Sequence, residues 1–502
     1  MKREILIETE LGQTRLALLE DGELAEYYVE RSGQEKLPGN IYVGRVANIL
    51  PGMQAAFVDI GLDKNAFLHA GDIKIDKSDF GPDAENIERQ LSSQSIGKML
   101  RMGQTLLVQV VKDAGGTKGP RISSHATLPG RLAVLLPTVS YVGVSRRIED
   151  EDTRLRLRAT AEACRPEGMG LIVRTAAAVA SEDDLRRDVA SLARLWQSIQ
   201  TRAQYSTAPA LIHRDEGLVY RAVRDLLTPE VEKVLIEGEA SFKIARETAE
   251  TLSPELVQRI ELYTGETPLF DLYRVDAKLE KACQRHVWLK SGGFLMVDFT
   301  EALTVIDVNT GKFVGSKNLD DTVYKINCEA AREIARQLRL RDIGGIVVID
   351  FIDMEAEEHR EGLLALMRQL LRQDRTKTNL VGMTGLGLVE MTRKKLRQPI
   401  HTQLQRPCPE CGGSGLVDSA ETIARRILHE LRGRAAHGQE ESASWLIKAS
   451  SAVAGQLMLI GAPERMRAFA LPEAVWPDKH YVIEPAVERE LPQKARLLPS
   501  NV

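Results

Sequence analysis

Two apolar segments in the second half of the chain, each delivering an acidic side chain, leave few folds open to it. Leu303–Asn309 and Gly345–Asp353 are rich in Val and Ile, and a helical pattern, Glu329–Leu340, lies between them. A strand, a helix and a second strand in this order predict parallel neighbouring strands. We therefore expect an α/β fold in which Asp307 and Asp350 converge where these strands end.

The side chains at these strand ends have the chemistry of a hard-metal site. An ionised carboxylate in an apolar strand is costly unless a partner offsets its charge. The two-residue strand period places Asp307 and Asn309 on one face, and Asp350 can face Asp307. Two carboxylates suit Mg²⁺, which keeps water ligands and completes its shell with phosphate. The alternative is structural, with the acids capping helices or pairing with Arg341 or Lys312.

The first third of the chain has the pattern of a small β-barrel. Gly, Pro, Asp and Asn turn signals separate short strand-like segments, which are Ile5–Ile7, Ile41–Leu50, Ala55–Ile60, Ala66–Ala70 and Leu106–Val111. Alternation places Phe57 and Phe67 on the polar faces, where rings can stack unpaired bases, and Lys112 ends a later strand. We expect an OB-like barrel interrupted by a polar loop at 71–103. Packing of the rings beneath a neighbouring domain is the alternative.

From about residue 181 the pattern becomes helical and stays so to about 265. Ser181 and Asp184 have the spacing of a capping box, which marks a helix start. Apolar residues then recur at helical spacing, namely Leu185, Val189, Leu192, Trp196 and Ile199. Just before this region, Arg174 and Thr175 end an apolar strand, and a guanidinium beside a hydroxyl can hold a terminal phosphate. An ordinary surface arginine is the simpler interpretation.

Charge is unevenly distributed along a chain whose net charge is −4. Between Lys112 and Arg147, six Lys and Arg residues, Arg146 among them, face one acid, a local balance of +5. A second basic run covers 393–397. Such patches bind phosphates while the acidic remainder of the chain limits non-specific binding. Solvated surface is the alternative for both runs.

The pair Cys408 and Cys411 resembles half of a zinc knuckle, because Pro and Gly flank the two thiols. The other cysteines of this chain are isolated, so a site with four thiolates requires a second subunit and predicts a homo-oligomer. A redox pair is the alternative, but such a pair normally opens a helix, which the glycines at 412–415 disfavour.

Length and composition set the class of protein. The chain has 502 residues, which suggests about three domains. Hydrophobic residues at 43% and charged residues at 27% are typical of globular proteins. No uncharged apolar run approaches the roughly 18 residues of a membrane span, and the N-terminus lacks a signal-peptide core. Five cysteines exclude a disulfide scaffold, so we expect a cytoplasmic protein with no membrane partner.

Together these motifs resemble the ribonuclease E/G family over about residues 1–416. The segments that carry the resemblance, in family order, are Gly39–Arg45, Met53–Asp63, Ile172–Ala176, Thr304–Gly311, Ala335–Arg341, Val348–Met354 and Cys408–Cys411. The stretches at 313–315 and 386–392, together with the lack of a long disordered tail, favour the G branch of the family.

The resemblance implies an endonuclease that cuts single-stranded, A/U-rich RNA, prefers a 5′-monophosphate end, and processes rRNA precursors and mRNA. It makes Asp307 and Asp350 the Mg²⁺ ligands and Asn309 their polar support. A non-catalytic RNA-binding adaptor is the alternative function. Such an adaptor could use the barrel, the basic patches and the zinc link, but it would not need the acids on the apolar strands.

The remaining site residues are also implied by the family. Phe57, Phe67 and Lys112 would grip RNA, with Arg146 and Arg147 as further RNA-binding residues. The 5′-phosphate sensor would comprise Arg174, Thr175 and Lys377; the family's arginine at this last position is a lysine here, which keeps the charge but loses the bidentate fork. Zn²⁺ at Cys408 and Cys411 would join two subunits into a homodimer, or into a dimer of such dimers.

The implied fold class is α/β and multidomain, with an OB-fold barrel inserted in an RNase H-like subdomain. The expected order is 1–35 RNase H-like (first part), 36–125 barrel, 126–214 sensor region, 215–279 RNase H-like (second part), 280–400 DNase I-like catalytic subdomain, 401–416 zinc link and 417–502 small oligomerisation domain.

Overall fold

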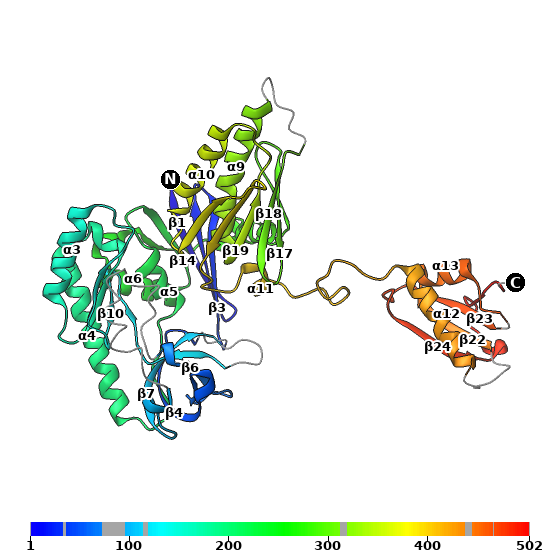
Figure 1. The fold of residues 1–502 in the computed structure, drawn as a ribbon, viewed down its shortest axis with the longest axis horizontal. Helices are drawn as coiled ribbons and strands as arrows, with labels where there is room; N and C mark the ends of the chain where they lie inside the picture. Colours follow the sequence, from blue (N-terminus) through cyan, green and yellow to red (C-terminus); the bar gives the residue numbers. More distant parts are fainter. Residues whose placement is uncertain are drawn as a thin grey trace. The chain divides into compact units, whose positions relative to one another are not determined.

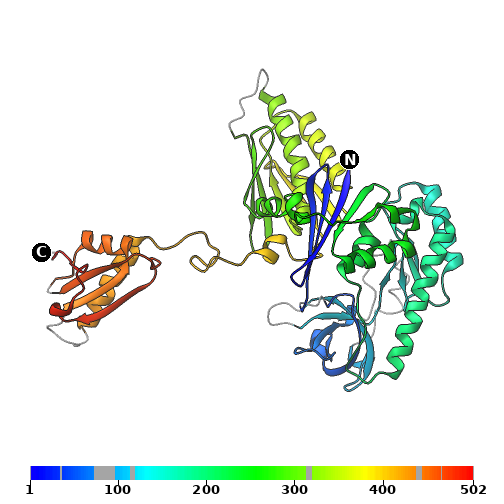
Figure 2. The ribbon, with the colours of Figure 1, turned by 180° about the vertical axis from the view of Figure 1, so that it is seen from behind.

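The computed structural model describes residues 2–33, 37–72, 96–113, 119–311, 319–436, 444–464 and 466–500. They form two compact units, Met1–Ile400 and His401–Val502, which we describe separately. Both units are built from β-sheets with helices packed on them, so the mixed α/β class is confirmed (Figures 1 and 2). No helix within those ranges combines the length and the apolar character needed to cross a bilayer.

A five-stranded sheet in the first unit joins segments that are far apart in sequence. Its order is β15-β14-β1-β2-β3, with bounds β1 Arg3–Glu10, β2 Gln13–Glu20, β3 Glu23–Arg31, β14 Val231–Glu237 and β15 Ile260–Leu262. The helices packed on it are α5 Leu218–Leu226, α6 Glu239–Leu252, α7 Leu269–Leu272 and α8 Val275–Ala282. Ile5 and Ile7 face α5 and α6, whereas Leu6 faces α7 and α8. Because both faces are covered, β14 shows no clean alternation, and the sequence pattern missed it.

The barrel expected from the first third of the chain is confirmed, except that Ile5–Ile7 belongs to β1 of the five-stranded sheet and not to the barrel. Its strands are β4 Ile41–Leu50, β5 Ala55–Asp59, β6 Ala66–His69, β7 Thr105–Lys112 and β8 Arg121–Ser123. They run in the order β4-β5-β6-β8-β7, and pairing of β4 with β7 closes the ring, while β13 (Ala210–His213) adds to β4 from outside. Val58 and Leu68 are buried inside, as alternation predicts. A short helix, α2 (Ile96–Met99), precedes β7, and most of the loop expected at 71–103 lies outside the described residues.

A smaller four-stranded sheet follows, in the order β11-β12-β10-β9. Its elements are β9 Leu128–Pro129, β10 Ala133–Leu136, β11 Val142–Val144, β12 Gly170–Val173, α3 Glu151–Cys164 and α4 Glu182–Tyr205. The capping box predicted at the start of α4 is present, with both Ser181 and Asp184 making their bonds. The five apolar residues predicted for its inner face are the ones that α4 buries.

The acidic strands belong to a six-stranded sheet, ordered β16-β17-β18-β19-β21-β20. The bounds are β16 His286–Trp288, β17 Phe294–Phe299, β18 Leu303–Asn309, β19 Gly345–Asp350, β20 Thr378–Met383, β21 Leu388–Arg393, α9 Leu319–Leu340 and α10 Glu357–Leu371. β18 and β19 are parallel neighbours joined through α9, as predicted. Helices α9 and α10 share one core with the sheet and lie together on one of its faces (Figure 1). The opposite face presents the acidic residues.

The sequence after Leu416 predicts a helix at 422–432 followed by an irregular segment, but the structure shows that this second unit is ordered. It contains α11 (ending at Leu404) and an ordered α/β core, whose elements are α12 Ala420–Ala436, α13 Ser451–Ile460, β22 Ser444–Ser450, β23 Arg467–Glu473, β24 Tyr481–Ala486 and β25 Arg496–Leu497. The helix expected at 422–432 is confirmed within α12. Strand β22 was missed because Trp445, Leu446 and Ile447 are buried in succession, which hides the two-residue period.

Candidate functional site

Asp307 and Asp350 lie directly opposite each other on neighbouring strands. The parallel register pairs Asp307 of β18 with Asp350 of β19. Ile306, Val308 and Ile349 point into the core beneath the helices, so the strand period turns both acids to the open face. The sequence prediction that the two carboxylates converge agrees with this register.

The environment of the pair favours a cation. Asn309 Nδ2 donates to Asp307 Oδ2 at 2.7 Å, which fixes the orientation of that carboxylate. Partial burial, followed by the negative charges of Asp307 and Asp353, raises the pKa of Asp350. Across the described ranges, no group of three or more His, Cys, Asp or Glu side chains is placed to hold a metal ion. Two carboxylates with open coordination positions match Mg²⁺, which retains waters and takes phosphate oxygens.

Arg341, one of the two proposed ion-pair partners of these acids, is bound elsewhere. Its Nε donates to Gln337 Oε1 at 2.5 Å inside the protein, and burial lowers its pKa to about 10. Lys312, the other proposed partner, and the motif at 313–315 lie outside the described residues. Neither acid is therefore accounted for by an ion pair with Arg341.

Phe57 and Phe67 form a cross-strand pair on the outside of the barrel. They are opposite each other in the β5–β6 register, half-buried, with ring centroids 6.0 Å apart in an edge-to-face arrangement. His69 stacks on Phe67 with a centroid separation of 6.4 Å. Lys112 is exposed at the end of β7. Among the residues that the structure describes, both rings remain partly accessible to solvent.

Arg121 was not singled out from the sequence as a site residue. The β8 register places it opposite both Phe67 and Lys112. Asp72 holds its guanidinium through two bonds, of 2.7 and 2.6 Å. The sequence shows that Arg121 belongs to the basic run, but its proximity to Phe67 and Lys112 results from long-range strand pairing, which the sequence pattern does not show.

Arg174, Thr175 and Lys377, the residues expected to recognise a 5′-phosphate, line a large cleft of about 2250 Å³. Arg174 Nη1 contacts Asp225 Oδ1 at 2.8 Å and donates to the Gly130 carbonyl oxygen at 2.5 Å. Thr175 shares a 2.9 Å hydrogen bond between hydroxyls with Ser145. Burial alone would raise the pKa of Asp225, but the bonds and charges of Arg224 and Arg174 outweigh it and lower the pKa. The contacts with Asp225 and Gly130 fix the Arg174 guanidinium at the cleft wall.

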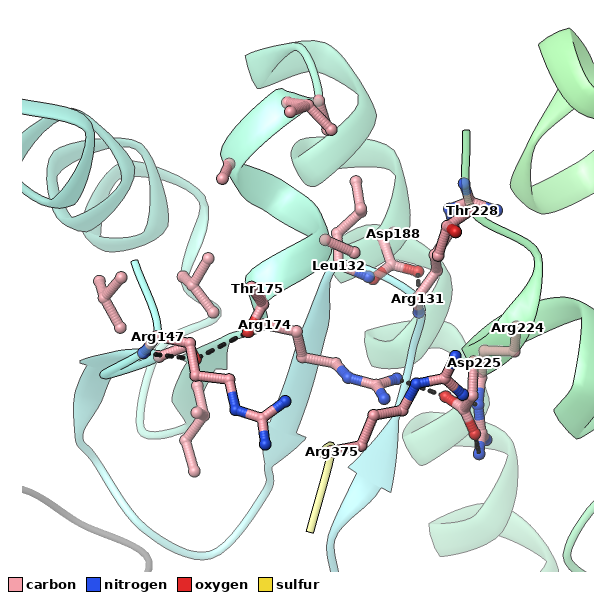
Figure 3. A pocket seen from close by; sticks show the side chains of 18 of the residues that line it. Arg131, Leu132, Arg147, Arg174, Thr175, Asp188, Arg224, Asp225, Thr228 and Arg375 are labelled. Atoms are coloured by element: carbon pink, nitrogen blue, oxygen red, sulfur yellow. Dashed lines mark hydrogen bonds and ion pairs between the residues drawn. The ribbon is translucent and has the colours of Figure 1, made fainter. Parts of the chain in front are cut away.

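The cleft is strongly cationic. Thirteen arginines and one lysine line it, against nine carboxylates. Lys377 lies in it with Arg174 and Thr175, as do Arg146 and Arg147. Figure 3 shows two further arginines beside Asp225 that the sequence did not single out, Arg224 and Arg375, and a third cleft arginine, Arg131, that extends toward Thr228. They come from separate elements, so no local pattern could have grouped them.

The second basic run has a structural role at Arg393. This side chain is buried, and it contacts Asp342 at 2.8 Å and Asp374 at 2.7 Å. Arg147 Nη2 in turn donates to the Asp374 carbonyl oxygen. Arg393 therefore connects β21 to the cleft wall through Asp374. Because this side chain is buried in ion pairs, it is neither a phosphate-binding residue nor part of a solvated surface.

Cys408 and Cys411 lie in a glycine-rich loop of the second unit. Backbone N–H groups of Gly415 and Gly413, together with the Cys408 thiol, lower the pKa of Cys411. Both glycines have positive φ, of 75° and 98°, which lets their N–H groups turn toward the sulfur. The loop consists of turns, not a helix start, which disfavours the redox alternative. The loop brings two thiols together, and a tetrahedral zinc site with four cysteine ligands would need two more.

Comparisons with known proteins agree with this arrangement. The Ribonuclease E/G family model matches residues 127–396. Ribonuclease G of Escherichia coli (strain K12) is 43% identical over 91% of this chain and 92% of its own length. Ribonuclease G of Haemophilus influenzae is 44% identical over 85% of this chain and 87% of its own length. Ribonuclease E of Escherichia coli (strain K12) is 37% identical over 85% of this chain but 40% of its own length.

The higher identity and the matched length place the chain on the G side, as its motifs predict. The family match covers the strands with Asp307 and Asp350 and most of the cleft lining, Arg174, Thr175 and Lys377 included. From the family model and the full-length relatives together, we conclude that the chain belongs to the ribonuclease E/G family.

Proposed function

We propose that this chain is an Mg²⁺-dependent endoribonuclease that cuts single-stranded, A/U-rich RNA in rRNA maturation and mRNA decay. The cytoplasm is its site of action, where its five free thiols stay reduced. The observation that carries the proposal is the register that sets Asp307 against Asp350 on an open sheet face. An RNA-binding adaptor would have no use for this pair of like charges.

Asp307 and Asp350 would hold the Mg²⁺ ion. Partial burial first, and then the negative charges of Asp307 and Asp353, raise the pKa of Asp350, and a bound divalent cation would offset both effects. When bound, the ion activates water and neutralises charge on the phosphate. Asn309 keeps the Asp307 carboxylate oriented. In the hydrolysis, the water oxygen bonds to phosphorus and the P–O3′ bond breaks, so one product ends in a 3′-hydroxyl and the other begins with a 5′-phosphate.

The barrel would position the RNA strand. Phe57 and Phe67 offer half-buried rings for base stacking, and such stacking contributes about 1–3 kcal/mol per base. Lys112 and Arg121 lie beside them and can pair with the phosphates. Stacking accepts any unpaired base, which fits a preference for single strands over duplex.

The cleft would bind the 5′ end of the RNA and stimulate cleavage of monophosphate substrates. Arg174 and Thr175 offer a guanidinium and a hydroxyl at one wall, and Lys377 supplies a further cation. Arg146 and Arg147 line the same cleft and extend its positive charge. Because lysine is a point charge without the arginine fork, we expect weaker discrimination between 5′ ends than an arginine would give.

Cys408 and Cys411 would bind Zn²⁺ together with the same pair from a second copy. The lowered pKa of Cys411 supports a thiolate ligand. In such a homodimer, residues 401–416 are the zinc link and residues 417–502 are an oligomerisation domain. Within the first unit we assign 36–125 as an OB fold, 126–214 as the sensor region, 280–400 as DNase I-like, and 1–35 with 215–279 as RNase H-like.

The test compares cleavage of a short A/U-rich RNA that carries either a 5′-monophosphate or a 5′-triphosphate. Wild type, Asp307→Asn and Asp350→Asn are each assayed with Mg²⁺ and with EDTA. We expect cleavage to need both aspartates and Mg²⁺ and to run faster on the monophosphate. Binding without cleavage under every condition would leave only the adaptor function.

A further inference from the structure

Three aromatic side chains cluster at the edge of the six-stranded sheet. His286 and Phe294 stack with centroids 4.2 Å apart and an interplanar angle of 21°. Trp288 lies 4.3 Å from His286 and 5.6 Å from Phe294, tilted against both. Trp288 is 68% exposed, whereas the partners beneath it are half-buried. The cluster therefore presents one supported indole to solvent on the edge strand.

This cluster shares rows with the proposed catalytic residues. Across β16, β17 and β18 the register aligns Trp288 with Phe294 and Asn309. The next row of the same face aligns His286 with Met296, Asp307 and Asp350. Strands are about 4.8 Å apart, so Trp288 lies two strand spacings, roughly 10 Å, from Asn309.

Burial shows that these rows lie on one face. Val287, Leu295 and Val297 alternate with the aromatic residues and belong to the core under α9 and α10. The rings therefore project to the opposite face, which also presents the acids. His286 Nδ1 is buried and has no hydrogen-bond partner among the described residues. Such an atom is uncommon in a purely structural cluster.

We propose that Trp288, supported by His286 and Phe294, is a stacking site for one unpaired base of the RNA strand held at Asp307 and Asp350. An exposed indole recognises the flat face of a base, and it is uncharged, so a base and not a phosphate is its ligand. The Asp307–Asp350 pair lies one row further along and two to three strand spacings across, roughly 12–16 Å from Trp288, so the stacked base would be about two nucleotides from the scissile bond. This inference deepens the proposed function and rests on its location of the active site.

The first test measures binding of a labelled A/U-rich RNA to the full chain in an Asp307→Asn/Asp350→Asn background, where the RNA stays intact. Trp288→Ala should weaken binding about five- to tenfold, and Trp288→Phe should restore it to within about twofold, because phenylalanine still stacks. Tyr205→Ala is the matched control, since Tyr205 is 86% exposed at the end of α4; it should leave binding unchanged.

An abasic scan locates the contact. One base at a time is removed along the RNA, and we expect a single position at which the loss costs the parent protein as much as Trp288→Ala does. At that position Trp288→Ala should show no further loss. Equal abasic losses in both proteins at every position would overturn the proposal.

Fluorescence gives an independent readout. The chain has four tryptophans, of which Trp196 and Trp445 are buried. RNA should quench part of the emission, and Trp288→Phe should remove that quenching while RNA still binds. Quenching that persists in this variant would contradict stacking on Trp288.

Two outcomes separate this site from its alternatives. If Trp288→Ala lowers the mass of the assembly in light scattering, the face is covered by a second copy and the base site is wrong. If Asp307→Asn still cleaves RNA, the proposed active site is wrong. The abasic scan measures binding and not cleavage, so its result for Trp288 is independent of that outcome.

Discussion

Replacing Asp350 by Asn should stabilise the metal-free protein while abolishing cleavage. The substitution keeps the shape of the side chain and removes one of two like charges that face each other across parallel strands. If the pair serves to hold a cation, the repulsion between its two carboxylates lowers the stability of the metal-free protein, and catalysis requires the pair to be kept despite this cost. The two effects therefore have opposite signs.

The magnitude follows from the strand spacing. With the carboxylates about 5 Å apart, Coulomb's law gives roughly 0.8 kcal/mol at the dielectric constant of water and about 3 kcal/mol at an effective value of 20. Asp350 is exposed, so the lower end applies. For the unit Met1–Ile400, an unfolding entropy of about 2.1 cal/mol/K per residue converts a gain of about 1 kcal/mol into a rise of roughly 1 °C in the unfolding midpoint.

The pH dependence has a defined sign. The pKa of Asp350 is raised above its ordinary value of 3.8, so the folded state binds this proton more tightly than the unfolded state. Stability therefore falls as pH rises from about 3.8 through the raised pKa, and the full cost applies above it. The advantage of Asp350→Asn should be largest at neutral pH and disappear toward pH 3.8.

Thermal unfolding in EDTA and in Mg²⁺ measures the first effect, and RNA cleavage measures the second. Mg²⁺ should stabilise the wild type more than Asp350→Asn. Glu301→Gln is the control, because Glu301 is exposed in the turn at the opposite end of β18. It should change neither stability nor cleavage. The reasoning is refuted if Asp350→Asn is less stable than wild type in EDTA, or if it cleaves at the wild-type rate.

Four further predictions concern other parts of the molecule. Arg393→Ala should cost about 3–5 kcal/mol in urea unfolding, because it leaves Asp342 and Asp374 buried without their partner. Arg174→Ala should bring the ratio of initial cleavage rates on monophosphate and triphosphate RNA toward one, with little change on a 5′-hydroxyl RNA. Phe67→Ala should weaken RNA binding about five- to 150-fold with an unchanged salt slope, whereas Lys112→Ala should reduce the log–log salt slope by about 0.7. Cys411→Ser should lower the zinc content per chain and halve the mass of the assembly in light scattering, and an unchanged mass would contradict the zinc link.

Local patterns were sufficient where the physics is local. Four of the five barrel strands, the helix that begins after Ser181 and the strand–helix–strand unit around Asp307 and Asp350 were predicted correctly, whereas β8 was missed and Ile5–Ile7 was wrongly grouped with the barrel. Each correctly predicted element has an apolar period on one face and turn or capping signals at its ends. Strands β14 and β22 were missed because strands buried on both faces show no alternation.

By itself the sequence determined which side chains have site chemistry and which face of their own element they occupy. Asp307, Asn309 and the two phenylalanines could be placed this way, because side-chain direction follows from the strand period. Only the tertiary structure decided which of them are neighbours. The cross-strand rows that align Trp288 with Asn309, and the cleft that gathers arginines around Asp225, both depend on contacts between distant segments. Those contacts are set by strand order and packing, which no local period encodes.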